Sequence, residues 1–377
     1  MFYLKDQSIL RRGCTFFDTC WQEEVMAKNV IRVPQGCPTI NEAMELAEIF
    51  SWRSVYSKER PLKIDLDEGV HKIDTFVPDR LNTGAALRVT CHNITFAGKG
   101  RYKTIIDGGF QVLNRKNITF EAMAIHYNPD EDVDNIDNPD AVLALYGSLT
   151  NANVLNCEVK GGRNSDGMVV GKGATVTATN CSFLESNHTG VTCRGANTKV
   201  TLNKCNMERN GLNGVDIYGC AAFRATICNF TENMGCGVYT WNAKAILFDC
   251  LSHRNDCDGL FISDSGTVTA TNSHFVENAE NGVCCRGDNT DVQLNDCTSH
   301  HNKRTGLFAW NRGAVARLRG TKTDIHSNKK DGIQAGDGGH VMIYLPSEHN
   351  TSHDNEEEDM RTCYGTASRI TFVIQKF

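Results

Sequence analysis

Residues 167–213 read GMVVGKGATVTATNCSFLESNHTGVTCRGANTKVTLNKCNMERNGLN, and residues 259–305 repeat 21 of these 47 positions at a shift of 92 residues. The longest shared phrase is TVTATN, at 175–180 and again at 267–272. The shift equals four shorter units of 22 to 24 residues, so we interpret the two stretches as a duplicated four-unit block. A repeat of this length is typical of solenoid proteins.

Each unit contains a Gly followed by an apolar residue. These glycines recur 22 to 26 residues apart, at Gly167, Gly190, Gly214, Gly237, Gly259, Gly282, Gly306 and Gly332. An Asn precedes the Gly by three or four residues, at Asn187, Asn210, Asn233, Asn255, Asn278, Asn302 and Asn328. A third column holds Cys157, Cys181, Cys205, Cys228, Cys250 and Cys297, with Ser273 in its one gap. Columns that stay in step over eight units indicate one repeated structural element.

The units alternate apolar and polar residues with period two, as in Val176 to Thr179 and Val200 to Asn203, and no unit contains a helix-length apolar stripe. Three short strands fit into such a unit, and stacked units pair their backbones at ~4.8 Å. We therefore predict an all-β parallel solenoid. The Asn column is expected to form a buried hydrogen-bonded ladder, and the Cys column to pack in the narrow core.

The N-terminal part is less regular. Thr39-Ile-Asn-Glu42 is a capping box, and the apolar residues after it have helical spacing. We predict a helix over 39–51 that caps the open end of the solenoid, where unpaired strand edges would promote aggregation. The predicted organisation is an arm or cap over 1–35, a β-helix over 36–355 with irregular coils over 60–165 and regular coils over 167–355, and a C-terminal tail or cap strand over 356–377.

Two further stretches are similar to segments of a known family: VPQGCPTINEAMELAE at 33–48 and IIDGGFQVLNRKNITFEAMAI at 105–125. With the Asn ladder and the Gly-apolar strand starts, the chain resembles the right-handed parallel β-helix proteins of the pectin-lyase-like superfamily over roughly residues 30–345. It is most similar to β-helix-repeat proteins of algae and protists and to carbohydrate-binding and sugar-hydrolysis repeats. The resemblance implies a single right-handed β-helix. It leaves lyases, hydrolases, esterases, epimerases, tailspikes and non-catalytic adaptors open.

A complete catalytic signature is absent from the sequence. The segment Asn164-Ser-Asp166-Gly167 matches the first element of the polygalacturonase pattern, but the next units lack the paired acids and the His. Hydrolysis needs two carboxyl groups across the scissile bond. The weak catalytic candidates are Asp166, Asp216 and Asp258, although an Asp before a Gly is also ordinary turn chemistry.

One outer face of the predicted β-helix is the best candidate for a binding surface. Counted from each repeat Gly, the residues two and four positions later should point outward. We call these two columns the outward strip. They place large aromatic and Arg side chains together, which suits sugar stacking or a protein hot spot, unless another segment covers the strip. The predicted binding residues are Arg194, Asp216, Tyr218, Tyr239, Trp241, Phe261, Arg286, Phe308 and Trp310.

Charge and targeting limit the partners. The net charge is −6 with a pI near 6.1, which argues against nucleic acid. Neither a signal peptide nor a membrane-spanning stretch is recognisable, so we expect an intracellular, cytoplasmic protein with no membrane partner. The acidic segment 130–140 is expected to be a solvated loop, with calcium binding at Asp130, Asp132 and Asp134 as the weaker alternative; no other cofactor or metal is expected.

Two classes of function remain open. The first is a non-catalytic recognition protein that binds a polysaccharide or a protein on the outward strip. The alternative is a carbohydrate-active enzyme, a lyase, hydrolase or uronate epimerase, with Arg194 or Arg286 holding an anionic sugar. A purely structural role in a larger assembly is a third reading. The sequence leaves the oligomeric state open.

Overall fold

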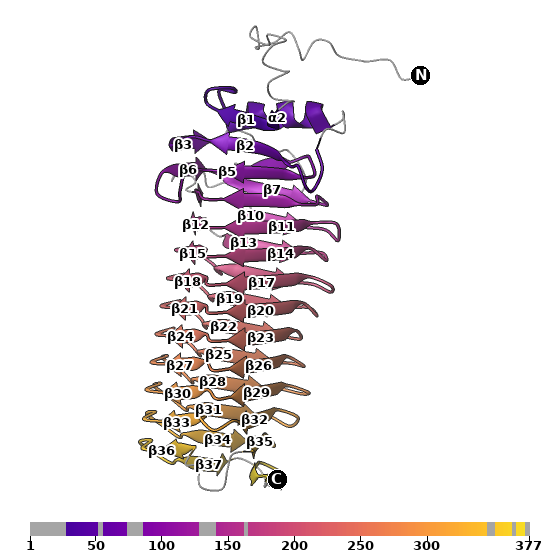
Figure 1. The fold of residues 1–377 in the computed structure, drawn as a ribbon. Helices are drawn as coiled ribbons and strands as arrows, with labels where there is room; N and C mark the ends of the chain where they lie inside the picture. Colours follow the sequence, from indigo (N-terminus) through magenta and orange to yellow (C-terminus); the bar gives the residue numbers. More distant parts are fainter. Residues whose placement is uncertain are drawn as a thin grey trace, which may run out of the picture.

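The computed structural model describes residues 28–51, 56–73, 86–127, 141–161, 165–344, 351–363 and 367–373. Its strands form three parallel sheets of 14, 12 and 12 strands, stacked into one elongated solenoid (Figure 1). Each regular coil adds one strand to each sheet. The predicted all-β parallel solenoid is therefore confirmed.

Sheet A consists of β1 (Val30–Val33), β2 (Leu62–Leu66), β5 (Ile94–Ala97), β8 (Ile118–Glu121), β11 (Asn151–Leu155), β14 (Thr175–Thr179), β17 (Lys199–Asn203), β20 (Ala222–Thr226), β23 (Lys244–Phe248), β26 (Thr267–Thr271), β29 (Asp291–Asn295), β32 (Val315–Arg319), β35 (His340–Ile343) and β38 (Arg369–Phe372). Sheet B consists of β3 (Gly69–Lys72), β6 (Thr104–Asp107), β9 (Ala124–Tyr127), β12 (Glu158–Gly161), β15 (Ser182–Leu184), β18 (Asn206–Glu208), β21 (Asn229–Thr231), β24 (Leu251–His253), β27 (His274–Val276), β30 (Thr298–His300), β33 (Asp324–His326) and β36 (Ser352–His353). Sheet C consists of β4 (Ala86–Val89), β7 (Gly109–Leu113), β10 (Ala141–Tyr146), β13 (Asp166–Gly171), β16 (Val191–Arg194), β19 (Val215–Tyr218), β22 (Val238–Trp241), β25 (Leu260–Ser263), β28 (Val283–Arg286), β31 (Leu307–Trp310), β34 (Ile333–Gly336) and β37 (Met360–Cys363).

The helix α2 (Ile40–Ser51) covers the N-terminal end of the solenoid, where it packs on β1 and β2 (Figure 1). The Thr39 hydroxyl accepts a hydrogen bond from the backbone N–H of Glu42 at 3.2 Å, as the capping box predicts. The apolar face of the helix is buried through Ile40, Ala43, Met44, Leu46, Ala47 and Phe50. The predicted capping helix is thus confirmed, and it begins one residue later than predicted, at Ile40.

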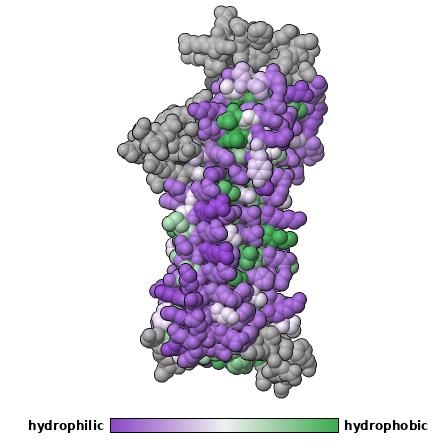
Figure 2. Space-filling model, turned by 90° about the vertical axis from the view of Figure 1, so that its left-hand side faces the viewer, coloured by the Kyte–Doolittle hydropathy of each residue, from purple (hydrophilic) through white to green (hydrophobic). Residues whose placement is uncertain are grey.

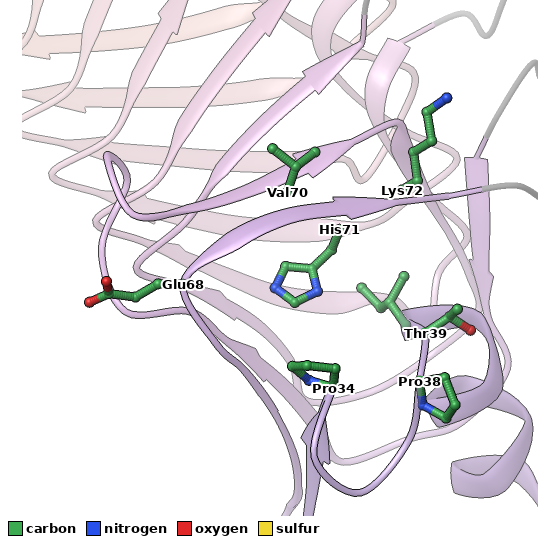
Figure 3. Close-up of a pocket in the computed structure, with 8 residues that line it drawn as sticks. Pro34, Pro38, Thr39, Glu68, Val70, His71 and Lys72 are labelled. Carbon is green, nitrogen blue, oxygen red and sulfur yellow. The ribbon is translucent and has the colours of Figure 1, made fainter.

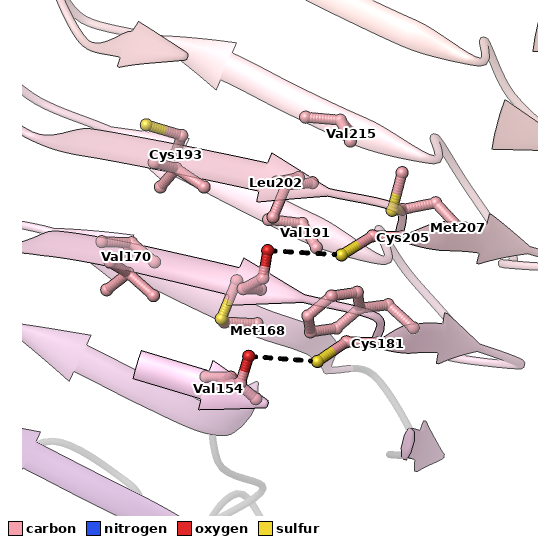
Figure 4. Packing of buried hydrophobic residues seen from close by; sticks show 14 of the residues in the cluster. Val154, Met168, Val170, Cys181, Val191, Cys193, Leu202, Cys205, Met207 and Val215 are labelled. Atoms are coloured by element: carbon pink, nitrogen blue, oxygen red, sulfur yellow. Dashed lines mark hydrogen bonds between the residues drawn. The ribbon is translucent and has the colours of Figure 1, made fainter. Parts of the chain in front are cut away.

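The cysteine column lies inside the core, as predicted. Cys157, Cys181 and Cys205 are at most 1% exposed, and burial raises the pKa of the Cys157 thiol to about 11. Each thiol donates to backbone carbonyls: Cys181 Sγ lies 3.3 Å from the Val154 oxygen on the preceding coil (Figure 4). Ser273 fills the gap in the column, and its hydroxyl donates to the Thr271 carbonyl at 3.0 Å. We interpret these thiols as structural, because they are buried in the core and hydrogen-bonded to backbone carbonyls.

The asparagine ladder is present with one correction at its start. Asn210 Oδ1 accepts from the backbone N–H of Ser186 at 3.1 Å, so Ser186 and not Asn187 occupies the first position of the ladder. Asn187 is exposed, and its spacing of three residues from Gly190 differs from the four found in the later units. At the other end, Asn355 continues the ladder, because its Oδ1 accepts from Asn328 Nδ2 at 3.0 Å.

Several predictions fall outside the described residues. Residues 1–27 of the predicted arm and the calcium candidates Asp130, Asp132 and Asp134 are among them. The domain boundaries stay a prediction, although β37 and β38 join sheets C and A within the predicted tail. In the part of the chain that the structure describes, no helix is long and apolar enough to cross a membrane. The intracellular location also stays a prediction.

Candidate functional site

The outward strip runs along sheet C in unbroken register. Residues of the strip pair directly with their equivalents on the next strand, as in Thr192 with Asp216 and Asp216 with Tyr239. The alternate residues of these strands, such as Val215 and Ile217, are fully buried. All nine predicted binding residues lie on the outer side of the sheet with half-buried or exposed side chains. Other members of the strip are buried, namely Val169, Thr192, Ser263 and Cys284.

Aromatic rings form three contacts along the strip. Tyr239 and Phe261 stack with centroids 5.3 Å apart and planes 9° from parallel. Tyr218 lies 6.5 Å from Trp241. Further along, Phe308 and Trp310 are 5.3 Å apart.

The indole rings of Trp241 and Trp310 are the largest apolar groups of this surface. Trp241 keeps 46% of its surface exposed, which is a large apolar area to leave open to solvent. A Cβ built on Gly336 would lie 2.5 Å from the Trp310 ring, so only Gly lets the indole lie over that rung. The rings give the strip a ladder of flat apolar surfaces.

Arg194 is held at one end of the strip by two tyrosines. Its guanidinium donates to the Tyr146 hydroxyl at 3.0 Å and to the Tyr218 hydroxyl at 3.5 Å, and it lies 5.6 Å from the centre of the Tyr146 ring. Lys172 Nζ is 5.5 Å from the same ring. Tyr146 pairs with Gly171 on the next strand, so it extends the outward strip by one rung. This end therefore presents fixed positive charge beside aromatic surface.

Two of the three carboxylate candidates converge on one residue. The Thr189 backbone N–H donates to Asp166 Oδ1 at 3.1 Å, and the Thr189 hydroxyl donates to Asp216 Oδ2 at 2.9 Å. Asn213 Nδ2 also donates to Asp216 Oδ1 at 2.6 Å. Asp166 and Thr189 each directly precede a repeat Gly on successive coils, and Asp216 lies on β19, one coil beyond Thr189.

Burial raises the pKa of both carboxyl groups. The pKa of Asp216 reaches about 6, because burial and the neighbouring Asp166 outweigh the hydrogen bonds from Thr189 and Asn213. Burial also raises the pKa of Asp166. Hydrogen bonds from Thr192 and Thr189 and the positive charge of Arg194 oppose this rise at Asp166. Two neighbouring buried carboxyl groups, one of which has a pKa near neutrality, are the pattern of an acid–base pair.

The third candidate stands apart. Asp258 is 7% exposed, and its Oδ1 accepts from both the backbone N–H and the side-chain Nδ2 of Asn281, each at 2.8 Å. It sits at the same turn position four coils beyond Asp166, and burial raises its pKa to about 6. The structure therefore does not bring Asp258 together with the other two carboxyl groups. We interpret Asp258 as a structural residue that links its turn to Asn281 on the next coil.

A stability measurement checks the electrostatics of this site. Because the pKa of Asp216 is higher in the folded chain than the ~3.9 of a free Asp, its stabilising contribution is complete below about pH 4 and is lost as the pH rises through about 6. We therefore expect Asp216→Asn to raise Tm at about pH 8 relative to the wild type, with the gain vanishing near pH 4. A Tm difference that does not depend on pH would contradict the raised pKa.

A pocket of about 270 Å³ opens elsewhere, beside the capping helix (Figure 3). It is lined by Pro34, Pro38, Thr39, Ile40, Glu68, Val70, His71 and Lys72. Two of its ionisable groups already have partners: His71 Nε2 lies 2.9 Å from the Asp67 carbonyl oxygen, and Glu68 pairs with Lys103 at 2.7 Å. We assign no function to it. Among the described residues, no three His, Cys, Asp or Glu side chains gather as a metal ion would require.

Comparison with known proteins identifies the class. The family described as right handed beta helix region matches residues 81–250 and 167–322, which is more than half of the chain. The chain therefore belongs to the right-handed β-helix family, and its fold is that of the pectin-lyase-like superfamily. No curated protein is detectably similar in sequence.

Solved structures agree on the fold. The A-module of a mannuronan C-5 epimerase from Azotobacter vinelandii is 12% identical with a TM-score of 0.53, over 89% of this chain and 96% of that chain. The catalytic domain of an α-1,3-glucanase, solved with nigerose, is 10% identical with a TM-score of 0.50, over 90% of this chain and 68% of that chain. The Agl-KA catalytic domain is 12% identical with a TM-score of 0.50, over 92% and 68%. At such identities the likeness concerns the fold alone.

Proposed function

We propose that the protein binds a polysaccharide along the outward strip of sheet C. The observation that carries this proposal is the ladder of aromatic rings, with Tyr239 stacked on Phe261 and Trp241 exposed beside them. Sugar rings stack on such flat apolar faces, while a polar edge contacts the flanking groups. Because the strip repeats its binding groups coil after coil, it suits a linear polymer better than a compact ligand.

Two further features support a polysaccharide over a protein partner. Arg194 and Arg286 occupy the same column of the strip, four coils apart, and can donate to hydroxyl or carboxylate oxygens of a sugar. Solved structures of this fold include proteins named for action on mannuronan and on α-1,3-glucan. A protein partner remains the alternative if no glycan binds.

Binding measurements with variants test the proposal. We expect Tyr239→Ala and Trp241→Ala each to weaken binding to a responsive glycan by about 30-fold or more, because central aromatic residues contribute about 2 kcal/mol or more. The probe is a panel of neutral and uronate-containing oligosaccharides measured by calorimetry. The matched control is Phe248→Ala, which removes a 40% exposed aromatic side chain from sheet A and should leave binding unchanged. If all variants bound the glycan with the affinity of the wild type, the outward strip would not be the binding site.

The Asp166–Asp216 pair favours a second candidate, an enzyme acting on the bound polysaccharide. Asp216 is suited to give or take a proton near neutrality, Asp166 supplies a second carboxyl group beside it, and Arg194 is placed to hold an anionic sugar. We expect Asp216→Asn to abolish turnover while glycan affinity changes less than threefold. Products are followed by NMR, which distinguishes cleavage from epimerisation. Equal turnover by the wild type and Asp216→Asn would exclude this pair as the catalytic centre.

A further inference from the structure

Five histidines gather on the outer face of sheet B, a different sheet from the one that carries the strip. They lie on β27, β33, β36, and at the end of β30: His274, His300, His301, His326 and His353. Figure 2 shows the side that includes these short strands, and its C-terminal part is mostly hydrophilic. The carbohydrate proposal does not use this cluster.

Three of these imidazoles are stacked on consecutive rungs. His300 pairs in register with His326, and His326 with His353. The ring centroids are 4.8 Å and 5.2 Å apart, and the planes are 11° and 8° from parallel. His301 sets its ring edge-on to His300, with the two Nδ1 atoms 2.8 Å apart. This arrangement requires most of these rings to be neutral, because protonated rings at this spacing would repel one another.

The charged groups around the stack come from each strand packed against it. His274 on β27 and His301 after β30 add further imidazoles near His300. Asp324 on β33 and Asp354 after β36 supply the carboxylates: His353 Nε2 lies 3.1 Å from Asp324 Oδ1, and His353 Nδ1 lies 2.9 Å from Asp354 Oδ2. Both carboxylates contact the last ring of the stack directly, and the charge of Asp324 acts more weakly on His300 and His326, where burial outweighs it.

The surroundings of the three stacked histidines shift their pKa values in different directions. Burial lowers the pKa of His300 to about 4 and also lowers that of His326, with neighbouring imidazoles adding to the effect. The two aspartates raise the pKa of His353. On acidification, His353 is thus charged first and opposes the charging of His326. Because the unfolded chain binds protons at His300 and His326 near pH 6.5, the stability of these coils falls as the pH drops from there towards 4.

The rung at the end of the stack is short. β36 has two residues, and it joins sheet B only through the pairs Ile325 with Ser352 and His326 with His353. The turn that follows is held by Asn355, which accepts from Asn328 Nδ2 at 3.0 Å, and by the Ser352 hydroxyl, which donates to the Asp359 carbonyl at 2.5 Å. Repulsion within the stack therefore acts where sheet B has the fewest pairs.

We propose that the stacked imidazoles of His300, His326 and His353 form an acid-sensitive latch, which holds the C-terminal coils closed at neutral pH and opens them on acidification. The opened segment comprises β33, β36 and the turn over 354–359. The coils that carry Tyr239, Trp241 and Phe261 stay folded, because in the described part of the chain the stacked imidazoles lie on β30, β33 and β36. The latch gives the protein a response to an acidic compartment or medium at the C-terminal end of the β-helix.

Hydrogen–deuterium exchange at about pH 7 and about pH 4, corrected for the intrinsic exchange rate, tests the latch. In the wild type, peptides covering 324–326 and 351–359 should lose protection by about 10-fold or more at the lower pH, while peptides from β18 and β21 keep theirs. The double variant His300→Gln/His326→Gln removes the titrating rings and should keep most of its protection. The matched control is His253→Gln, which lies in the same column on β24 but is separated from His300 by Val276. It should respond to acid like the wild type.

Three outcomes would overturn the latch. The first is a wild type whose C-terminal coils stay protected at about pH 4. The second is loss of protection along the whole β-helix at once, which is global acid unfolding. The third is a double variant that loses protection as the wild type does, which would assign the response to the carboxyl groups Asp324 and Asp354. The single variant His326→Gln, measured in parallel, gives the same decision if the double variant is unfolded at pH 7.

Discussion

Asn255→Ala is expected to lower the free energy of unfolding by about 3–5 kcal/mol, among the largest effects of any single substitution in this chain. Asn255 Oδ1 accepts from both the backbone N–H and Nδ2 of Asn233, at 3.1 and 2.9 Å. Its own Nδ2 donates to the Phe230 carbonyl and to Asn278 Oδ1, each at 3.0 Å. Ala would leave several buried polar groups without partners, and each costs about 1–3 kcal/mol.

Urea unfolding followed by circular dichroism measures this effect. The matched control is Asn229→Ala: Asn229 is exposed and donates to Asn206 on the surface at 3.0 Å, so its loss should cost about 0.5 kcal/mol or less. If both variants lose the same small amount, the buried ladder does not stabilise the coils as argued. The comparison isolates burial, because the residue type and the change are identical.

Gly237→Ala is expected to cost about 3 kcal/mol or more for a steric reason. A Cβ at this position would lie 2.7 Å from the carbonyl oxygen of Gly259 on the next coil and 2.0 Å from the Ser252 hydroxyl. The carbonyl cannot move away freely, because it accepts from the Val238 backbone N–H at 3.1 Å and from the Ser252 hydroxyl at 2.8 Å. The added methyl group must therefore push two coils apart.

Thermal unfolding checks this prediction, with Asp256→Ala as the control in the exposed turn of the next coil. The control should melt with the wild type, whereas Gly237→Ala should melt several degrees lower or fail to fold. A Gly237→Ala protein as stable as the control would show that the coils can separate at no cost. The repeated glycines would then need a different explanation.

The sequence predicted the repeating parts of the structure well, because eight copies of one unit report the same environment. The inward column of Cys157 and Cys181 and the capping residue Thr39 are where the pattern placed them. The outward direction of Tyr239 and Trp241 follows from period-two alternation alone. Whether a side chain points inward or outward depends on the backbone conformation, and the repeated sequence pattern determines that conformation.

Features that join side chains from different coils could not be predicted. Thr189 brings Asp166 and Asp216 together, yet it is an ordinary turn residue in the sequence, and its role depends on side-chain orientation across successive coils. Tyr146 joins the strip from a coil before the first repeat Gly. The histidine stack has one recognisable pattern in the sequence, a His two residues before the ladder Asn, as at His326 and His353.

The indole signals of the tryptophans test the central claim most directly, namely that a polysaccharide lies on the outward strip. The protein contains four tryptophans, so ¹⁵N labelling gives few indole N–H resonances, and Trp→Phe variants assign those of Trp241 and Trp310. On titration with a glycan that binds in the panel, we predict saturable shifts of the Trp241 resonance first and of Trp310 with longer oligosaccharides. Binding that leaves both resonances unchanged, or a panel with no binding glycan, would contradict the account.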